Sequence, residues 1–170
     1  KGFSMEWEER AEVKKGNIGE KIVNEYLINK GYIPYSPDVS TAHPFDRIVA
    51  SKDKKGIFIA DAKTKAKRKF YPDTGIEIKH WKEYSFISKK YSIKVFIFFV
   101  DEENQSIYGN WLSKLEEPQK ITVRNNVIEY PLFQGSVIYF PMVNMVDIAK
   151  ISERQAVKIS ELTTKNIIYK

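Results

Sequence analysis

The chain has 170 residues, a length that suits one compact domain, and its 42% hydrophobic and 29% charged residues are ordinary for a folded protein. It contains no cysteine and two histidines, which excludes disulfides, thiolate nucleophiles, iron–sulfur clusters and zinc sites built from Cys or from three His. Any metal chemistry must therefore rest mainly on Asp and Glu, which favour hard cations such as Mg²⁺ or Mn²⁺. The 28 Lys and Arg exceed the 22 Asp and Glu, and this net charge of +6 suits an anionic partner without requiring one.

The hydropathy pattern predicts no membrane-spanning segment. The longest apolar run, residues 95–100, has the length of a buried strand and is far shorter than the ~18 residues of a membrane span. No secretory signal is recognisable near the N-terminus. We therefore expect a cytoplasmic protein that makes no membrane contact.

The N-terminal part of the chain has a helical pattern. Apolar residues recur at helical spacing between about residues 6 and 30, and Gly31 supplies a typical helix end. Gly16 and Gly19 interrupt the pattern, so either one helix or two shorter ones could form. A short strand is predicted next, over residues 32–35.

A β-hairpin is the clearest predicted unit. Residues 45–50 and 57–63 have strand patterns, and the polar, glycine-ending stretch 52–56 joins them as a turn. The following residues, 64–73, are polar and basic and predict a loop.

A helix and two strands are predicted after this loop. Thr74 and Glu77 match a capping box, which predicts a helix from residue 74 to about residue 89. Residues 93–100 predict a central strand that is apolar on both faces, and residues 106–112 predict its neighbour.

The C-terminal part predicts short strands and one last helix. Ser152 and Gln155 form a second capping box, and Ala156, Ile159 and Leu162 would face inward from the helix that follows. The short strands are predicted near residues 121–123, 127–130 and 137–140. The order of elements predicts a mixed α/β domain with helices flanking a sheet.

An acidic residue two positions before a lysine occurs four times in the chain, so context has to separate the candidates. The four pairs are Glu12 and Lys14, Asp53 and Lys55, Asp61 and Lys63, and Glu77 and Lys79. A charged helix start, a turn and a predicted helix cap account for three of them. Asp61 and Lys63 differ because they continue the face of an apolar strand that begins with Ile57 and Ile59. Buried charges there require a partner or a cation, and the alternative is a plain Asp–Lys ion pair at a strand end.

Asp46 strengthens the interpretation that these charges form a site. It lies in a row with Ile48 and Ala50 on the first hairpin strand, and its cross-strand partner falls close to Asp61 or Lys63. Two carboxylates that close repel each other unless a divalent cation lies between them. The hairpin therefore predicts a metal site of hard oxygen ligands.

Glu20 is a third candidate carboxylate, on the first predicted helix. Val23 and Leu27 follow it at helical spacing, so Glu20 borders the apolar face of the helix. On spacing alone, a site residue and an exposed charge at the edge of the helix remain equal alternatives.

The assembled motifs resemble those of the PD-(D/E)xK nuclease superfamily. The match consists of Gly19-Glu20 on the first helix, Pro44-Phe45-Asp46 opening the hairpin and Asp61-Ala62-Lys63 closing it. It covers about residues 15–112, with similarity to archaeal-type Holliday junction resolvases and the restriction-endonuclease-like branch. Two departures are Pro-Phe-Asp in place of Pro-Asp and Asp where Glu is commoner. The resemblance implies a single α/β domain over residues 5–170, with a restriction-endonuclease-like αβββαβ core, its mixed sheet flanked by helices, and a small β/α extension over residues 113–170.

The resemblance also implies roles for these residues. Asp46, Asp61 and the Ala62 carbonyl would hold Mg²⁺, for which Mn²⁺ would substitute, and Glu20 would bind the ion directly or through water. Lys63 would position the attacking water or offset charge on the phosphate. The implied activity is metal-dependent hydrolysis of DNA by an endonuclease. Alternatives are a structure-specific resolvase, for which a homodimer would be suitable, an exonuclease, an inactive nucleic-acid-binding module, or a non-nuclease α/β protein whose acidic residues are coincidental.

The predicted loop after Lys63 is a candidate DNA contact. Residues 52–90 hold twelve Lys and Arg against five Asp and Glu, so the net positive charge of the chain is concentrated here. The candidate phosphate contacts, next to the aromatic Phe70 and Tyr71, are Lys65, Lys67, Arg68 and Lys69. The alternative is a solvated surface loop. On the next predicted helix, His80 and Tyr84 share one face. Some exonuclease-like branches of the superfamily carry Gln-x-x-x-Tyr on this helix to support the metal site, but His replaces Gln here, so a surface pair is favoured.

Overall fold

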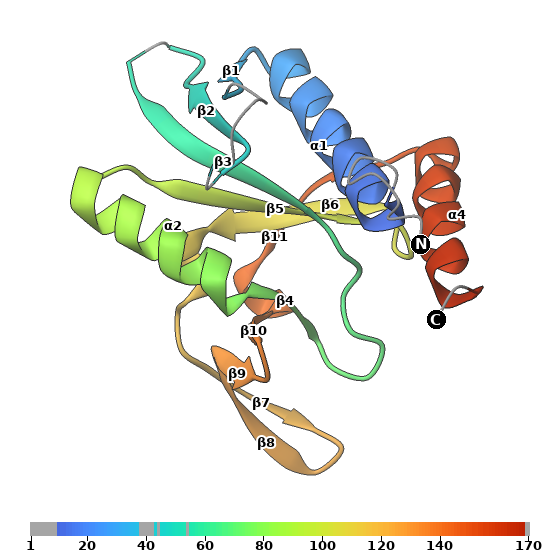
Figure 1. Cartoon of the computed structure of the whole chain (residues 1–170). Helices are drawn as coiled ribbons and strands as arrows, with labels where there is room; N and C mark the ends of the chain where they lie inside the picture. The colour runs from blue at the N-terminus through green and yellow to red at the C-terminus, as the bar shows by residue number, and fades with distance from the viewer. Residues whose placement is uncertain (1–9, 38–42, 44, 54, 169–170) are drawn as a thin grey trace, which may run out of the picture.

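The computed structural model describes residues 10–37, 43, 45–53 and 55–168 (Figure 1). The first helix, α1 (Ala11–Asn29), is continuous through Gly16 and Gly19, so the alternative of two short helices is wrong. It ends before Gly31, whose φ of +84° is the left-handed conformation that a residue without Cβ adopts at little cost. The predicted start of this helix near residue 6, like Pro44 of the hairpin motif, lies outside the described residues.

A six-stranded mixed sheet forms the centre of the fold, with strand order β1-β2-β3-β5-β6-β11. Strands β3 and β5 run parallel, and all the other neighbours in this sheet are antiparallel. The strands are β1 (Ile33–Tyr35), β2 (Arg47–Ala50), β3 (Ile57–Thr64), β5 (Val95–Asp101), β6 (Ser106–Trp111) and β11 (Val146–Lys150). The predicted hairpin is β2 and β3, and the predicted apolar central strand is β5.

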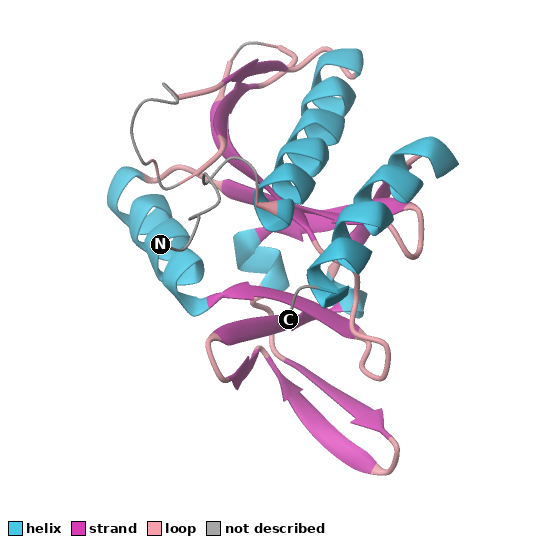
Figure 2. Cartoon of the chain, turned by 45° about the vertical axis from the view of Figure 1, so that its right-hand side comes forward, coloured by secondary structure: helices cyan, strands magenta, loops and turns pink. Residues whose placement is uncertain are grey.

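Helices cover both faces of this sheet, as the two views in Figures 1 and 2 show. Helices α1 and α4 (Glu153–Ile168) pack on one face, where Val23, Leu27 and Ile159 are buried with the sheet residues Val49 and Val100. Helices α2 (Ile78–Tyr91) and α3 (Leu112–Leu115) pack on the other face. The arrangement confirms the predicted α/β class with a mixed sheet flanked by helices.

The predicted capping box at Thr74 is wrong. Residues 73–77 form strand β4 (Asp73–Glu77), and α2 begins only at Ile78. Thr74 is fully buried opposite Phe140 in strand β10 (Val137–Pro141), and the Glu77 side chain makes no cap hydrogen bond. The pairing with a strand more than 60 residues away overrides the local helix-start pattern.

The chain after α3 adds to several parts of the fold. Strands β7 (Gln119–Val123) and β8 (Asn126–Tyr130) form a hairpin that extends away from the central sheet in Figures 1 and 2. Strands β4, β10 and β9 (Leu132–Gln134) form a three-stranded sheet, and a 3₁₀ turn (Met142–Asn144) leads to β11 at the edge of the central sheet. The predicted tail strands are confirmed as parts of β7, β8 and β10.

The second predicted capping box is confirmed. The Gln155 backbone N–H donates to Ser152 Oγ at 3.2 Å, and the Ser152 backbone N–H donates to Gln155 Oε1 at 2.8 Å. This cap opens α4, from which Ala156 and Ile159 point into the core as expected. Within the described ranges, no helix is long and apolar enough to cross a membrane.

Candidate active site

The register of the β2–β3 hairpin brings Asp46 beside the Asp61-Ala62-Lys63 segment. Arg47 lies opposite Ala60, so Asp46, the residue before β2, reaches the middle of β3. Its Oδ2 accepts a hydrogen bond of 2.7 Å from the Ala62 backbone N–H. The hairpin therefore places the half-buried Asp46 carboxylate next to Asp61, as the sequence predicts.

Asp61 and Lys63 form a largely buried ion pair at this position. Asp61 is only 1% exposed, and Lys63 Nζ lies 2.7 Å from its Oδ2. Ile59, on the same face of β3, is fully buried, but Ile57 at the start of the strand is exposed, so the row becomes core-facing only from Ile59 onward. The Asp61 charge is therefore held within the fold and not at its surface.

Tyr84 of α2 completes this part of the site, which corrects the expectation of a surface pair with His80. Tyr84 is 1% exposed, and its ring centroid lies 5.7 Å from Lys63 Nζ and 6.2 Å from the His80 ring. Burial and the adjacent Asp61 carboxylate raise the pKa of the Tyr84 hydroxyl, so it remains a hydrogen-bond donor. Burial, followed by the charge of Lys63, lowers the pKa of His80 and favours its neutral form.

The carboxylates interact strongly with one another. Burial, followed by the charges of Asp61 and Glu20, raises the pKa of Asp46 to about 8. Burial alone would lower the pKa of Lys63, but the Asp61, Asp46 and Glu20 carboxylates raise it above its usual value. Lys63 is therefore a permanent ammonium, and its single charge does not fully offset the acidic groups around it.

Glu20 reaches this cluster from α1 because the helix packs closely on β3 at Gly19. A Cβ on Gly19 would lie 1.8 Å from Thr64 Oγ1, a distance that no pair of non-bonded atoms adopts. The Glu20 side chain is 41% exposed. Burial and the charge of Asp61 raise its pKa, while Arg47 opposes the shift. Glu20 thus lies at the edge of the site, close enough for the charge of Asp61 to affect its pKa.

Arg47 is a site residue that the motif comparison missed. It is 4% exposed, and its Nη1 donates to the Glu20 carbonyl at 3.2 Å and to Asn24 Oδ1 at 3.1 Å. Its Nη2 lies 3.5 Å from Glu20 Oε2. The sequence contains a sign of this role, since Arg47 and Val49 share one face of the strand, the face directed at α1, and a charge on an apolar face requires partners.

The donor set at Asp46 and Asp61 fits a hard divalent cation. Protein sites usually hold Mg²⁺ through one or two carboxylates, and water and substrate phosphate complete its shell. A cation there would remove the charge repulsion that, in addition to burial, raises the pKa of Asp46. In the part of the chain that the structure describes, no group of three or more His, Asp or Glu side chains is placed to hold a metal ion. Ligation by Glu20 and by the Ala62 carbonyl therefore stays a prediction.

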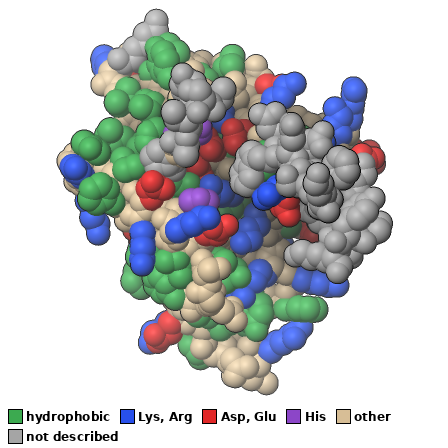
Figure 3. Space-filling model, in the orientation of Figure 1, with side chains coloured by type: hydrophobic (Ala, Val, Ile, Leu, Met, Phe, Trp, Pro, Cys, Tyr) green, Lys and Arg blue, Asp and Glu red, His purple; other side chains and the backbone are tan. Residues whose placement is uncertain are grey.

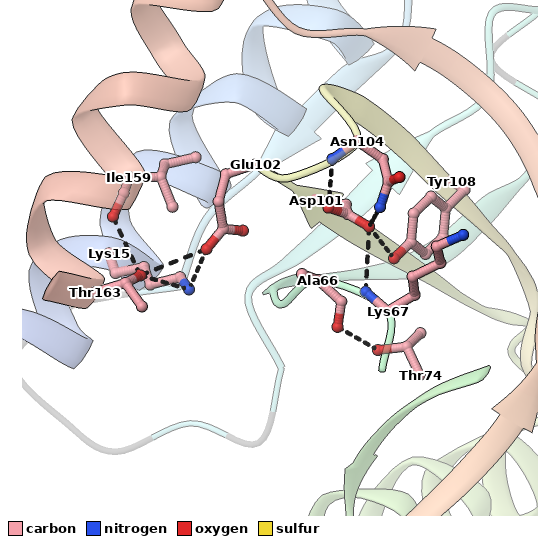
Figure 4. Close-up of polar contacts among 10 residues, drawn as sticks. All are labelled: Lys15, Ala66, Lys67, Thr74, Asp101, Glu102, Asn104, Tyr108, Ile159 and Thr163. Carbon is pink, nitrogen blue, oxygen red and sulfur yellow. Dashed lines mark hydrogen bonds and ion pairs between the residues drawn. The ribbon is translucent and has the colours of Figure 1, made fainter. Parts of the chain in front are cut away.

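The basic loop (residues 65–72) leaves β3 directly after this site and is held at both ends. The Lys67 backbone N–H donates to Asp101 Oδ2 at 3.1 Å, and Asp101 also accepts from Asn104 and Tyr108 (Figure 4). Lys65 Nζ donates to the Gly75 carbonyl at 3.1 Å. In the view of Figure 3, Asp and Glu side chains gather near the centre of the face, and Lys and Arg side chains lie next to them, lower in the view.

The cations of the basic loop fall into two groups. Arg68 forms a two-bond ion pair with the buried Asp73, with both N···O distances 2.6 Å. Lys65 is half-buried, whereas Lys67 and Lys69 are exposed. Of the four predicted phosphate contacts, the side chains of Lys67 and Lys69 are therefore the most accessible, and those of Lys65 and Arg68 are engaged within the protein.

Comparisons with known proteins identify the fold. No protein-family model and no curated protein matches the sequence. Among solved structures, the chain is similar to Hjc of Archaeoglobus fulgidus, a Holliday junction resolvase from an archaeal hyperthermophile. The TM-score is 0.53 at 8% sequence identity, and the match covers 83% of this chain and 99% of that chain. The chain thus has the restriction-endonuclease-like fold that the sequence predicts, and the resemblance to PD-(D/E)xK nucleases is confirmed at the level of the fold.

Proposed function

We propose that this chain is a metal-dependent deoxyribonuclease, an endonuclease of the PD-(D/E)xK type. The observation that carries the proposal is the convergence of Asp46 and Asp61 beside Lys63. Burial, followed by charge repulsion, raises the pKa of Asp46 to about 8 there. Maintaining such a cluster costs folding free energy, so it favours a site that operates with a cation bound over a merely structural ion pair.

The proposed reaction assigns a part to each side chain. Asp46 and Asp61 would hold Mg²⁺, which, when bound, would polarise the scissile phosphate and lower the pKa of a water molecule. Lys63 stays protonated and places a positive charge where the phosphate gains negative charge. Tyr84 and the Asp61–Lys63 contact fix the ammonium in position, and Arg47 fixes Glu20. Lys67 and Lys69 supply contacts to the DNA backbone.

The test is a cleavage assay with a matched control. The protein is incubated with plasmid, linear duplex, single-stranded and branched DNA in Mg²⁺ or Mn²⁺, and in EDTA. We expect Mg²⁺-dependent cleavage that Asp61→Asn reduces by at least 10²-fold, as expected when one charge of such a site is lost. Asp147→Asn is the control, because Asp147 also pairs with a lysine, Lys150, at 3.2 Å but is exposed.

Three outcomes would overturn parts of the proposal. If no DNA is cleaved in either metal while DNA is bound tightly, the chain is a binding module without catalysis. If cleavage survives both Asp46→Ala and Asp61→Asn, the catalytic site lies elsewhere. Equal loss of activity in Asp147→Asn and Asp61→Asn would mean that the Asp61 effect is not specific to the site.

A structure-specific resolvase is the second candidate, favoured by the similarity of the fold to Hjc, a Holliday junction resolvase. Preferential cleavage of a four-way junction over linear duplex of the same sequence would support it. Activity that begins only at DNA ends would support an exonuclease instead.

A further inference from the structure

An exposed aromatic residue lies where the basic loop meets the tip of the β7–β8 hairpin. Phe70 is 55% exposed, and the guanidinium of Arg124, at the hairpin turn, lies 4.7 Å from its ring centroid. Lys69 Nζ lies 5.6 Å from the same ring. Two segments separated by more than 50 residues thus bring cations to one accessible aromatic ring.

A second aromatic residue is held in the same loop. The Arg68 guanidinium lies between two rings, 4.3 Å from the centroid of Tyr71 and 3.8 Å from that of Tyr139. Tyr71 is 41% exposed. Because Arg68 also pairs with Asp73, the loop conformation that presents Phe70 and Tyr71 is fixed before any ligand binds.

One buried carboxylate ties the loop and the hairpin together. Asp73 is fully buried and accepts hydrogen bonds of 2.6 Å from Arg68 in the loop and 2.6 Å from the Tyr130 hydroxyl in β8. The relative placement of Phe70 and Arg124 therefore depends on a built contact within the fold and not on two independent surface segments.

The chemistry of this surface selects its ligand class. Lys69 and Arg124 are exposed cations that suit phosphates, and the nearby Asp73 is buried and paired with Arg68. The cations alone would be sufficient to bind phosphates. Exposed rings add a flat apolar face, which suits a nucleobase, but the bases of an intact duplex are stacked within the helix and cannot reach it.

We propose that this loop–hairpin surface (Lys69, Phe70, Tyr71 and Arg124) binds unpaired nucleotides of the DNA substrate. An unpaired base stacks on Phe70, and its neighbouring phosphates contact Lys69 and Arg124. The inference rests on the proposed function and narrows it, because it selects DNA that contains a single-stranded segment, such as a flap or a gapped branch, over fully paired DNA.

The experiment measures binding of fluorescent oligo-dT and of a duplex of equal length by anisotropy, in EDTA to prevent cleavage. Phe70→Ala should weaken oligo-dT binding about tenfold or more and duplex binding less than twofold. Phe70→Trp should restore oligo-dT binding, since it keeps an aromatic face. Arg124→Ala should lower the slope of log affinity against log salt by about 0.7 for oligo-dT.

Phe86→Ala is the matched control, because Phe86 is 60% exposed and has Lys90 Nζ 5.2 Å from its ring, but lies on α2. Unchanged oligo-dT binding in Phe70→Ala, or an equal loss in Phe86→Ala or on the duplex, would overturn the inference. Failure of the nuclease proposal is distinguishable. It would appear as absent cleavage in Mg²⁺ while the binding difference between Phe70→Ala and Phe86→Ala persists.

Discussion

The close approach of α1 to β3 at Gly19 leads to a sharp prediction for Gly19→Ala. An alanine Cβ would lie 1.8 Å from Thr64 Oγ1 and 3.1 Å from Thr64 Cβ, so the helix or the threonine must move. Movement of α1 would also displace Glu20 from the acidic cluster. Gly16, on the same helix, is the matched control, since a Cβ there would meet no atom within 4 Å.

The expected magnitudes follow from these two environments. Replacing glycine with alanine inside a helix stabilises by about 1 kcal/mol, so Gly16→Ala should raise the free energy of unfolding by that amount. Gly19→Ala gains the same stabilisation of the helix but incurs an overpacking cost of about 1–3 kcal/mol. Gly19→Ala should therefore be less stable than Gly16→Ala by about 1–3 kcal/mol, although the substitutions are chemically identical.

Urea denaturation of both variants measures this difference directly. The Thr64→Ala background removes the Oγ1 and Cγ2 atoms that Gly19→Ala would meet, so the difference between the two helix variants should shrink there. If Gly19→Ala stabilises the protein as much as Gly16→Ala, the helix–strand contact is looser than described. A cost that persists undiminished in the Thr64→Ala background would show that Thr64 is not its cause.

Three further predictions concern charges. Arg68→Ala should destabilise by about 3 kcal/mol in urea denaturation, because it leaves Asp73 buried without its ion pair, and a loss below 1 kcal/mol would refute this. In EDTA, the pKa of Asp46 in the native state, about 8, lies above its ordinary value of 3.8, so the native state binds more protons than the unfolded state between these values. The free energy of unfolding should therefore fall by about 1–3 kcal/mol between pH 4 and pH 8, because solvent screening of this half-buried group reduces the full effect. Asp46→Asn should remove most of that fall, with a remainder from Glu20, whose pKa burial also raises, and a pH-independent difference from wild type would contradict the assignment. Removing the charges of Lys67 and Lys69 together should reduce the salt-dependence slope of duplex binding by about 1.8, and an unchanged slope would exclude them as phosphate contacts.

The sequence predicted the parts of the fold that short-range patterns determine. The β2–β3 hairpin has a short turn, so its register, and with it the approach of Asp46 to Asp61, follows from counting residues. The α4 cap is equally local. Thr74 and Glu77 have the same local pattern as a cap but form a strand, because β10 supplies pairing partners that no local pattern reveals.

The site was predictable in its acidic groups and less so in the groups that hold them. Asp46, Asp61 and Lys63 stand out as charges in apolar rows. Arg47 also stands in such a row, but its partners on α1 become evident only when the helix is packed on the sheet. Tyr84 resembles a surface residue because its helix is polar on most sides, and its burial depends on contact with β3.

The basic loop shows why composition alone overstates a binding surface. Sequence cannot separate Arg68 from Lys67, since the partners that engage Arg68 lie on β4 and β9. Asp73 neutralises Arg68 inside the fold, and in doing so anchors the loop without using the exposed Lys67 and Lys69. A loop anchored through one cation can keep its remaining cations hydrated and ordered for a ligand, which lowers the entropy cost of binding. The strands after residue 112 thus contribute to the candidate DNA contact by fixing the loop that carries it.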